Sequence, residues 1–509
     1  MEKIMNITKE DLAKMTLPYL KSLDHETLVD ISFELRNVVI GLLERLEKNS
    51  KNSSNPPSSD NPYKKKPKDK EPESSDDEDK KDGEESHPEK PNDSPRPEPE
   101  RNPGRQPGSQ GFWRSETPVP EQIISHYPEQ CPCCNRHLNI PDKASPYMGY
   151  YVFELEKTDS GIRISCCLHH YYIIMCECGQ EVKSSPGQGY VSHQDGRKKD
   201  LKLTEYVMTG PMLVTFIAAL SVRYRMSRPK IREFLMYWFG LELSVGTIDR
   251  CIREAGVACF PVVEELIDEL QKEDVVHLDE TPWNEKGVLK WMWVAVSCTI
   301  AIYLIGTRKK EELLKLITEA FLGWLVTDGY MAYRDHEKRQ RCLAHLIRKA
   351  VALTGAVDEK AQKMGDWLLK ELRCLIKTMA EYGEDNKKKC SPILARLKKA
   401  CNLGAKEDHA KLKALANEIL NDWDAVVAFV KNPDLPPTNN EAERALRHAV
   451  ISKRISFGTR TSEGSKAYAA LLSVIETCRL RNQNPWDFIS QVISLGRKGI
   501  APGSIPLFS

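Results

Sequence analysis

Three acidic residues lie where short apolar segments end or where a helix is expected to begin. Asp279 follows an apolar β-branched pair and precedes Pro282, which predicts a strand that ends at a carboxylate. Asp328 ends a second apolar segment, and Glu443 opens a later helix. Strand ends can direct a charged side chain into a cleft while the strand stays buried. Three converging carboxylates suit a pair of hard divalent cations, so we predict a phosphoryl-transfer site that acts on nucleic acid.

Each of the three acids has a neighbouring rival, and any one acid alone is by default a solvated surface carboxylate. Glu280 adjoins Asp279, but alternation along a strand directs it to the other face. Asp335 lies beyond the end of the second strand, and Glu441 lies on a different side of its helix from Glu443. The prediction therefore depends on the three acids together.

The elements that must position these acids can be predicted from residue patterns. The expected order is strand 275–279, strand 289–297, strand 299–305, helix 308–322 and strand 324–328. Three strands that pair as a meander, a crossover helix and a strand beside the first are typical of a ribonuclease-H-like core. That topology places Asp279 and Asp328 side by side at the edge of the sheet. A polar helical insertion, 346–436, then separates Asp328 from Glu443.

Cysteines cluster in a separate part of the chain. Seven of the 15 cysteines fall between Cys131 and Cys178, and a chain without an export signal favours metal over disulfides. Two cysteine pairs facing each other predict a tetrahedral zinc site of Cys131, Cys134, Cys176 and Cys178. The second pair is tighter than usual, so the alternative ligands are Cys133, Cys166, Cys167, His169 and His170. A set of buried free thiols is the alternative to zinc.

A helix-turn-helix pattern is predicted before the first acid. Apolar residues at helical spacing are followed by a glycine turn and by Ser244, a good N-cap for a helix to about Glu254. Arg250 and Arg253 would lie on this second helix. The pattern also occurs in proteins that never bind DNA.

The N-terminal region combines a short helix with a low-complexity tract. Apolar residues at a/d spacing over 24–48 make fewer than three heptads, which fits either a dimerisation helix or a helix packed on its own chain. Residues 49–110 are rich in Lys, Glu, Asp, Pro and Ser, and they predict a disordered charged linker. Its last glycines and Arg105 suit a plain linker or a minor-groove contact.

Composition sets outer bounds on the function. The 509 residues suit roughly three domains, and 74 Lys and Arg against 73 Asp and Glu argue neither for nor against nucleic acid. No secretory signal is visible near Met1, and the apolar run Trp291–Gly306 is too short for a membrane helix. We expect a cytoplasmic, nucleoid-associated protein without a membrane segment.

Several motifs occur here in one order, and together they cover nearly the whole chain. They are Asn52–Asp60, Gly104–Gly108, the cysteine pairs, Asp279–Pro282, Thr327–Tyr333, Cys342–Lys349 and Asn439–Arg444. In this series the sequence resembles the DDE transposases of bacterial insertion-sequence family sixty-six (transposase C type). The family often has Asp before the Asn pair, where Thr438 stands here.

The resemblance implies roles for individual residues. Its acidic triad falls on Asp279, Asp328 and Glu443, with Asp279 bridging two Mg²⁺ or Mn²⁺ ions and the other two acids each holding one. Cys342 and His345 match a Cys-x-x-His signature, and His345 is either structural or in contact with DNA or metal. The residues expected to contact DNA are Arg250, Arg253, Arg348, Lys349, Arg444, Arg447, Lys453 and Arg454.

The resemblance also implies an activity and partners. The expected protein is a DDE transposase that binds the terminal inverted repeats of an insertion sequence, cuts them and joins them to target DNA. It would work as a homo-oligomer on DNA, with structural zinc and with small accessory proteins from the same element. One alternative is a catalytically inactive, domesticated DNA-binding regulator, and another is a structure-selective nuclease on the same fold.

The expected fold class is multidomain α/β, with a mixed sheet and flanking helices in its ribonuclease-H-like core. The domains would be an N-terminal helix or short coiled coil (1–48), a charged linker (49–112), a zinc-binding module (113–190), a helix-turn-helix-like region (200–258), the first part of the core (274–345), a helical insertion (346–436), the last core helices (437–490) and a C-terminal tail (491–509).

Overall fold

A computed structural model of the chain describes residues 22–46, 117–138, 144–189, 202–382 and 386–507. The first described element is the helix α3 (His25–Leu46). Its start is capped by Asp24, whose carboxylate accepts hydrogen bonds from the backbone N–H (2.8 Å) and the hydroxyl (2.7 Å) of Thr27. The predicted helix is therefore present, while its role in dimerisation stays a prediction. The predicted linker, 49–112, lies outside the described residues.

The cysteine-rich segment forms a sheet of long antiparallel strands. Strands β2 (Ala144–Thr158) and β3 (Gly161–Met175) make a hairpin whose turn uses Gly161 at φ 132°. Strand β1 (Gln122–His126) pairs parallel to β3, and β4 (Glu181–Lys183) pairs antiparallel to it. A two-stranded ribbon of β5 (Gln188–Gly189) and β6 (Leu203–Thr204) follows. Two long strands thus lie between the two cysteine pairs.

Four helices precede the central sheet. They are α4 (Pro211–Val222), α5 (Arg228–Phe239), α6 (Val245–Ala258) and α7 (Phe260–Leu270). Helix α5 ends at Gly240, whose φ of 64° is the left-handed conformation that glycine tolerates. The N-cap prediction for Ser244 is confirmed, because its hydroxyl accepts from the backbone N–H of Thr247 at 3.0 Å. Helix α7 was not predicted.

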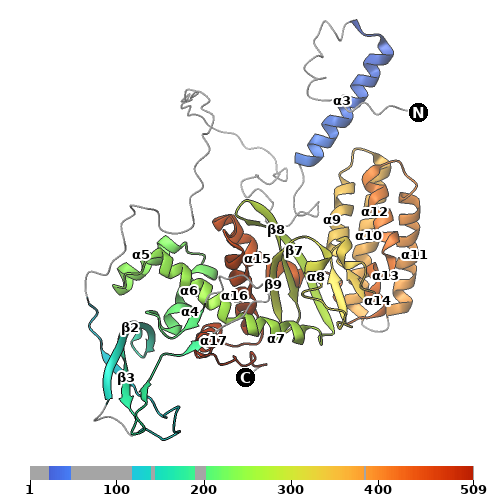
Figure 1. The fold of residues 1–509 in the computed structure, drawn as a ribbon. Coiled ribbons are helices and arrows are strands. Elements are labelled where there is room, and N and C mark those ends of the chain that lie inside the picture. Colours follow the sequence, from blue (N-terminus) through green and yellow to red (C-terminus); the bar gives the residue numbers. More distant parts are fainter. Residues whose placement is uncertain (1–21, 47–116, 139–143, 190–201, 383–385, 508–509) are drawn as a thin grey trace. The chain divides into compact units, whose positions relative to one another are not determined.

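The central sheet has five strands in the order β11-β10-β7-β8-β9 (Figure 1). They are β7 (Val275–Glu285), β8 (Val288–Val296), β9 (Ala301–Gly306), β10 (Trp324–Thr327) and β11 (Arg339–Arg341). Strands β7, β8 and β9 form the predicted antiparallel meander, and β10 and β11 run parallel to β7. The sheet is therefore mixed.

Strand β7 does not end at its carboxylate, contrary to prediction. It continues through Pro282 to Glu285, paired with β8 throughout. Strand β10 pairs with β7 only from Val275 to His277, and beyond that point no described strand pairs with this edge of β7 apart from an isolated bridge between Glu285 and Thr459. Proline is tolerated where no ladder hydrogen bond is required of its nitrogen, which explains why it does not terminate the strand.

The crossover helix predicted at 308–322 is mostly absent. Only α8 (Lys310–Leu313) is helical, and turns follow it. The side chain of Gln271 accepts from the backbone N–H of Thr318 at 3.0 Å and donates to the carbonyl of Leu316 at 2.9 Å. These backbone groups are thereby diverted from a helical ladder, while the apolar side chains of the segment still enter the core.

Three C-terminal helices complete this part of the molecule. They are α15 (Asn440–Ser456), α16 (Ser462–Leu480) and α17 (Pro485–Arg497). Helix α16 satisfies the outer edge of β9: the hydroxyl of Ser473 accepts from the Tyr303 N–H (2.9 Å) and that of Thr477 from the Ala301 N–H (3.0 Å). Helix α17 extends into the segment expected to be a tail, and Ile505 beyond it is buried.

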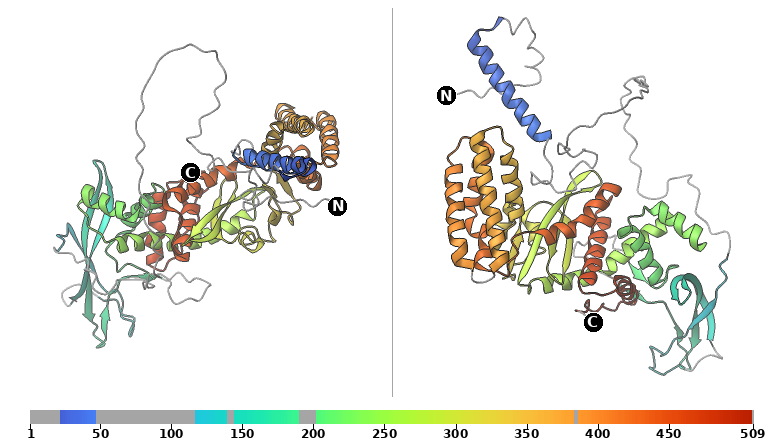
Figure 2. Two further views of the ribbon diagram at one scale, coloured as in Figure 1. Left: turned by 90° about the horizontal axis from the view of Figure 1, so that it is seen from above. Right: turned by 180° about the vertical axis from the view of Figure 1, so that it is seen from behind.

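The predicted helical insertion follows β11. Its helices are α9 (Leu343–Thr354), α10 (Glu359–Tyr382), α11 (Asn386–Gly404), α12 (Ala410–Asn421), α13 (Trp423–Val426) and α14 (Ala428–Lys431). They share a hydrophobic core of their own. In the two ribbon views of Figure 2 these helices lie together beside the central sheet. No helix in the described part of the chain is both long enough and apolar enough to span a bilayer.

Candidate active site

The pairing of β7 with β10 places two of the predicted acids at one level. The strands are parallel, with Val326 opposite His277, so continuing by two residues brings Asp328 to the level of Asp279. The carboxylate of Asp328 accepts from the backbone N–H of Tyr330 at 2.8 Å, and that of Asp279 accepts from the N–H of Glu280 at 2.9 Å. The sheet thus carries both acids to one edge.

Negative charge is concentrated around Asp279. Burial, followed by the neighbouring carboxylates of Glu280 and Asp328, raises the pKa of Asp279 well above its usual range. Glu443 contributes to the same upward shift. The three predicted acids are therefore close enough to repel one another, and such an arrangement favours a bound cation.

Asn439 ties the helix that carries Glu443 to the strand that carries Asp279. It is fully buried at the N-cap position of α15. Its side-chain amide donates to the carbonyl of Leu278 at 2.6 Å, and its oxygen lies 3.0 Å from Nδ1 of His277. Both partners immediately precede Asp279 in β7. This pair of hydrogen bonds fixes the first turn of α15, and hence Glu443, beside the acid-bearing strand.

Glu443 itself is held by residues of α9. Its carboxylate lies 2.7 Å from Nη2 of Arg348 and 3.8 Å from Nδ1 of His345. Ligand atoms of Cys342, His345 and Glu443 all lie within 4.8 Å of one another. In the described part of the chain, Asp279, Asp328 and Glu443 do not form such a group. Arg348, predicted to contact DNA, is engaged with Glu443 instead.

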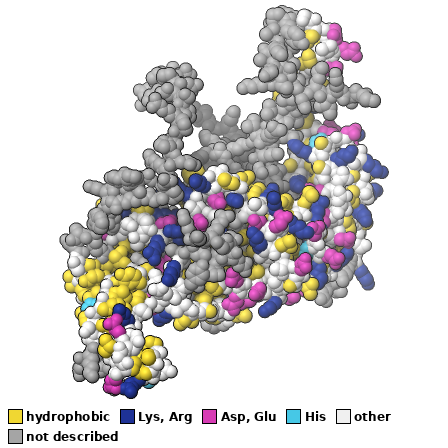
Figure 3. All heavy atoms as spheres, viewed as in Figure 1, with side chains coloured by type: hydrophobic (Ala, Val, Ile, Leu, Met, Phe, Trp, Pro, Cys, Tyr) yellow, Lys and Arg dark blue, Asp and Glu magenta, His cyan; other side chains and the backbone are white. Residues whose placement is uncertain are grey.

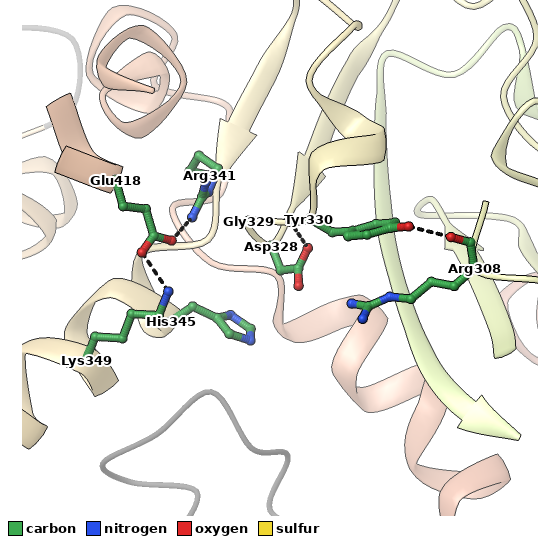
Figure 4. Close-up of a pocket in the computed structure, with 8 residues that line it drawn as sticks. All are labelled: Arg308, Asp328, Gly329, Tyr330, Arg341, His345, Lys349 and Glu418. Atoms are coloured by element: carbon green, nitrogen blue, oxygen red, sulfur yellow. Dashed lines mark hydrogen bonds and ion pairs between the residues drawn. The ribbon is translucent and has the colours of Figure 1, made fainter. Parts of the chain in front are cut away.

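A pocket of about 240 Å³ opens beside Asp328. It is lined by Arg308, Asp328, Gly329, Tyr330, Arg341, His345, Lys349 and Glu418 (Figure 4). Glu418 joins the two basic residues on one side, at 2.7 Å from Arg341 and 2.6 Å from Lys349. Arg308 extends from the opposite side toward Asp328. Glu418 is already paired with two of the basic residues, so a pocket in which Arg308 faces Asp328 suits a phosphate group next to the proposed metal ligand Asp328.

Arg308 is a functional candidate that the sequence did not reveal. Its guanidinium lies over the rings of Trp291 (4.0 Å) and Tyr330 (4.3 Å). It also binds the Glu280 carboxylate at 2.8 Å, which the Tyr333 hydroxyl contacts at 2.5 Å. Glu280 is thus occupied by a cation and a hydroxyl rather than left free. In the sequence Arg308 follows Gly306 and Thr307 at the end of an apolar strand, and no motif there indicates a phosphate-binding arginine.

The other predicted DNA contacts are distributed over α6, α9 and α15. Arg250, Arg447 and Arg454 are exposed. Arg253 pairs with Asp249 (3.1 Å) and Arg444 with Glu441 (3.1 Å), both at the surface. Lys453 is half-buried and donates to the carbonyl of Pro282 at 2.7 Å. On the face shown in Figure 3, basic and acidic side chains are interspersed over the sheet and the insertion.

A family comparison covers this whole arrangement. The model described as "Transposase IS66 family" matches residues 207–467, just over half of the chain, and this range contains Asp279, Asp328, Cys342, His345 and Glu443. This chain belongs to the IS66 family of transposases. A second model, described as a family of unknown function (DUF6444), matches residues 33–90 of this IS66-family chain.

Curated relatives of the IS66-family chain come from Sinorhizobium fredii. Uncharacterized protein y4qI is 22% identical over 339 residues, which are 59% of this chain and 62% of the relative. Uncharacterized protein y4jD is 22% identical over 325 residues, 56% of this chain and 63% of the relative. Uncharacterized protein y4hP is 33% identical over 76 residues. The matches thus span less than two thirds of the length of y4qI and y4jD.

The cysteine cluster lies outside the range of the transposase model. The four sulfurs of Cys131, Cys134, Cys176 and Cys178 lie within 4.8 Å of one another, with Cys131 and Cys178 at 3.7 Å and Cys134 and Cys176 at 3.6 Å. A tetrahedral zinc with Zn–S bonds of about 2.3 Å requires sulfurs about 3.8 Å apart, so the residues fit this ion. A backbone N–H of Cys134 is the main cause that lowers the pKa of Cys131 to about 7, whereas the neighbouring thiols raise the pKa values of Cys176 and Cys178.

Proposed function

We propose that this IS66-family chain is a DNA transposase with a ribonuclease-H-like core, which cleaves DNA at the element's terminal inverted repeats and joins the ends to target DNA. The observation that carries the proposal is the parallel register of β7 and β10, which brings Asp279 and Asp328 to one sheet edge. Helix α15, fastened to β7 by Asn439, adds Glu443 from a distant part of the chain. The match of residues 207–467 to a transposase family supports the same reaction class.

The three acids fit a site for Mg²⁺ or Mn²⁺. All donors are carboxylate oxygens, which hard cations prefer. Burial is the main cause that raises the pKa of Asp279, and a cation would neutralise the neighbouring carboxylates that raise it further. Asp279, Asp328 and Glu443 would together hold the ions. When bound, the metal pair activates the attacking oxygen and stabilises the leaving oxygen of a phosphodiester.

Residues of the pocket would orient the DNA backbone for this reaction. Arg308 is held by its aromatic neighbours next to Asp328, so its charge is placed in advance for a phosphate. Glu443 would have to share or exchange its ion pair with Arg348 in order to hold a metal. Once released, Arg348 would be free to bind the DNA backbone, as the sequence predicted.

The remaining segments would serve binding and assembly. Exposed Arg250 on α6 fits the proposed contact of the helix-turn-helix-like region with the terminal repeats. The four-cysteine cluster would hold one structural zinc ion. We further propose that α3 forms a short coiled coil in a homo-oligomer on DNA, and that accessory proteins of the element assist the reaction.

The test of the catalytic proposal is removal of one metal-ligating charge at a time. Asp279→Asn, Asp328→Asn and Glu443→Gln should each lower nicking of a supercoiled plasmid that carries the element's ends by about a thousandfold or more. The three act as one unit, so double variants should lose little beyond the singles. The matched control is Glu441→Gln, since Glu441 is exposed two residues from Glu443.

The same assay separates the transposase from its alternatives. Binding of the ends by wild type and triad variants, with no nicking by any of them in Mg²⁺ or Mn²⁺ and with accessory proteins supplied, would favour a domesticated regulator. Nicking that depends on DNA structure but not on the terminal repeats would favour a structure-selective nuclease. Normal nicking by Glu443→Gln would show that the third ligand is another residue.

A further inference from the structure

A second cluster of metal-binding side chains lies beside the proposed catalytic acids. Ligand atoms of Cys342, His345 and Glu443 all lie within 4.8 Å of one another. Cys342 is fully buried at the N-cap position of α9, and His345 follows three residues later on the same face of that helix. Glu443 reaches the pair from α15. Two of the three ligands are thus fixed by one helix turn, and the third comes from a helix anchored by Asn439.

One nitrogen of the cluster lacks the partner that a buried polar atom requires. Nδ1 of His345 is buried without a hydrogen bond to any described residue, and it lies 3.8 Å from the Glu443 carboxylate. An unsatisfied buried ring nitrogen is costly, and an ion or a water is the usual explanation. The gap of 3.8 Å is too long for a hydrogen bond, but it suits two ligands of one metal ion.

Burial raises the pKa of the Cys342 thiol, and backbone donors directed at its sulfur oppose this shift. Sγ of Cys342 accepts a hydrogen bond from the backbone N–H of Asn439 at 3.1 Å. Donors directed at a thiolate sulfur stabilise it and fix its orientation, as supporting groups do around metal ligands. The same Asn439 holds α15 against β7 through its side chain. The residue that positions Glu443 therefore also supports Cys342.

The donor set selects the class of metal. One thiolate, one imidazole and one carboxylate are typical of Zn²⁺ and related borderline ions, whereas Mg²⁺ prefers oxygen ligands alone. Three protein ligands leave the fourth tetrahedral position open. His345 also lines the pocket beside Asp328, so this pocket gives an ion a route from solvent.

We propose that Cys342, His345 and Glu443 bind one zinc-class ion at a site separate from the four-cysteine cluster. A thiolate and a carboxylate together neutralise the two positive charges of the ion. The bound ion would then take the place of Arg348 as the cation next to the Glu443 carboxylate. The consequence, which rests on the proposed function, is that Glu443 has two alternative roles as a metal ligand. It joins either this ion or the acids Asp279 and Asp328, and zinc occupancy opposes assembly of the Mg²⁺ site.

The test counts zinc in the full-length protein after dialysis against metal-free buffer with a weak chelator. Wild type should hold about two zinc ions per chain, one in each cluster. Cys342→Ser and His345→Gln should each hold about one, and so should Cys134→Ser, which removes only the four-cysteine site. Cys298→Ser, an exposed cysteine outside both clusters, is the matched control and should keep two.

A spectroscopic measurement identifies the ligand even if a variant is destabilised. Wild-type protein loaded with Co²⁺ should show a thiolate-to-cobalt charge-transfer band that persists in Cys134→Ser and disappears in Cys134→Ser/Cys342→Ser. An unchanged zinc count and unchanged band on loss of Cys342 would overturn the proposal. Glu443→Gln should lose one zinc, while Asp279→Asn should keep both. Because metal is counted directly, these outcomes stand whether or not the protein cleaves DNA.

Discussion

At the scale of single residues, Glu280 shows how an acid next to a proposed catalytic acid can have a structural role. Its side chain is 1% exposed and receives bonds from Arg308 and Tyr333. In Glu280→Gln the amide oxygen can still accept from Arg308 and the NH₂ group can donate to the Tyr333 hydroxyl, but the negative charge is lost. We expect a loss of roughly 1 kcal/mol in the free energy of unfolding, because the charge-assisted bond to partly exposed Arg308 becomes a neutral one.

Chemical denaturation of the full-length protein measures this loss. Glu441→Gln is the control, because Glu441 is exposed and pairs only at the surface with Arg444, so its change should stay within about 0.5 kcal/mol. Equal stability of Glu280→Gln and wild type would show that the charge of Glu280 is not important for folding. Nicking by Glu280→Gln should decline far less than in the triad variants, since its carboxylate is already occupied.

Sequence patterns predicted which acids lie together better than they predicted the other side chains that those acids contact. Asp279 and Asp328 could be paired because each follows an apolar strand segment, and parallel strands align their ends. The ion pair of Glu443 with Arg348 joins residues 95 positions apart, across the whole insertion. No local pattern encodes such a contact, because it depends on how two helices pack.

At the scale of elements, the meander and the capped helices could be predicted because their signals are local. Strand β11 could not, since Arg339 and Arg341 look like surface residues. Both are buried because Asp422 of the insertion binds them, at 2.6 Å and 3.0 Å. Long-range charge pairing therefore overrides the local preference of this segment, as Gln271 does for the expected crossover helix.

Helix α6 gives a prediction at the same scale. If it binds the terminal repeats, Arg250→Ala should weaken binding and reduce the slope of log affinity against log salt by about 1, because one phosphate contact is lost. Arg373→Ala, an equally exposed arginine on α10 of the insertion, is the matched control. The measurement is fluorescence anisotropy of an end fragment over a salt series. An unchanged slope for Arg250→Ala would exclude α6 from the phosphate contacts.

At the scale of the whole molecule, the helix-turn-helix-like region is not separable from the sheet. Residues of α4 to α7, of the central sheet and of α16 and α17 contribute to one hydrophobic core. Buried Glu254 on α6 pairs with buried Arg497 on α17 at 2.7 Å, and Arg223 pairs with Glu476 of α16 at 2.8 Å. A truncated protein starting at Asp274 would lose part of this core, so point substitutions are the sounder test of DNA binding.

This shared core also links pH to stability through His448. The histidine joins α15 to the end of α4, with Nε2 2.9 Å from the Val222 carbonyl and Nδ1 2.8 Å from Nη2 of Arg225. Arginine only donates, so Nδ1 must accept and Nε2 must carry the proton, which is the neutral imidazole. Burial, together with the charges of Arg225 and Arg223, lowers the pKa of His448 below its usual value of about 6.5.

The sign of the pH effect follows from proton binding. Below about pH 6.5 the unfolded chain takes up a proton at His448 more readily than the folded protein does. The contribution of neutral His448 to the free energy of unfolding is therefore complete above about pH 6.5. It is lost as the pH falls toward the pKa of His448 in the folded protein, which is lower. His448→Gln cannot titrate, but it keeps a donor for the Val222 carbonyl. Wild type should therefore lose more thermal stability than His448→Gln when the pH is lowered from about 7.5 to about 5.5.

Differential scanning fluorimetry of both proteins at the two pH values measures this difference. The comparison cancels groups common to both proteins, such as Glu154 and Glu476, whose pKa values are raised mainly by burial and which act in the opposite direction. Equal losses of Tm in wild type and variant would mean that His448 is not a neutral link between α15 and α4. A larger loss in wild type would mean that acid weakens the junction between the helix that carries Glu443 and the helices that precede the sheet.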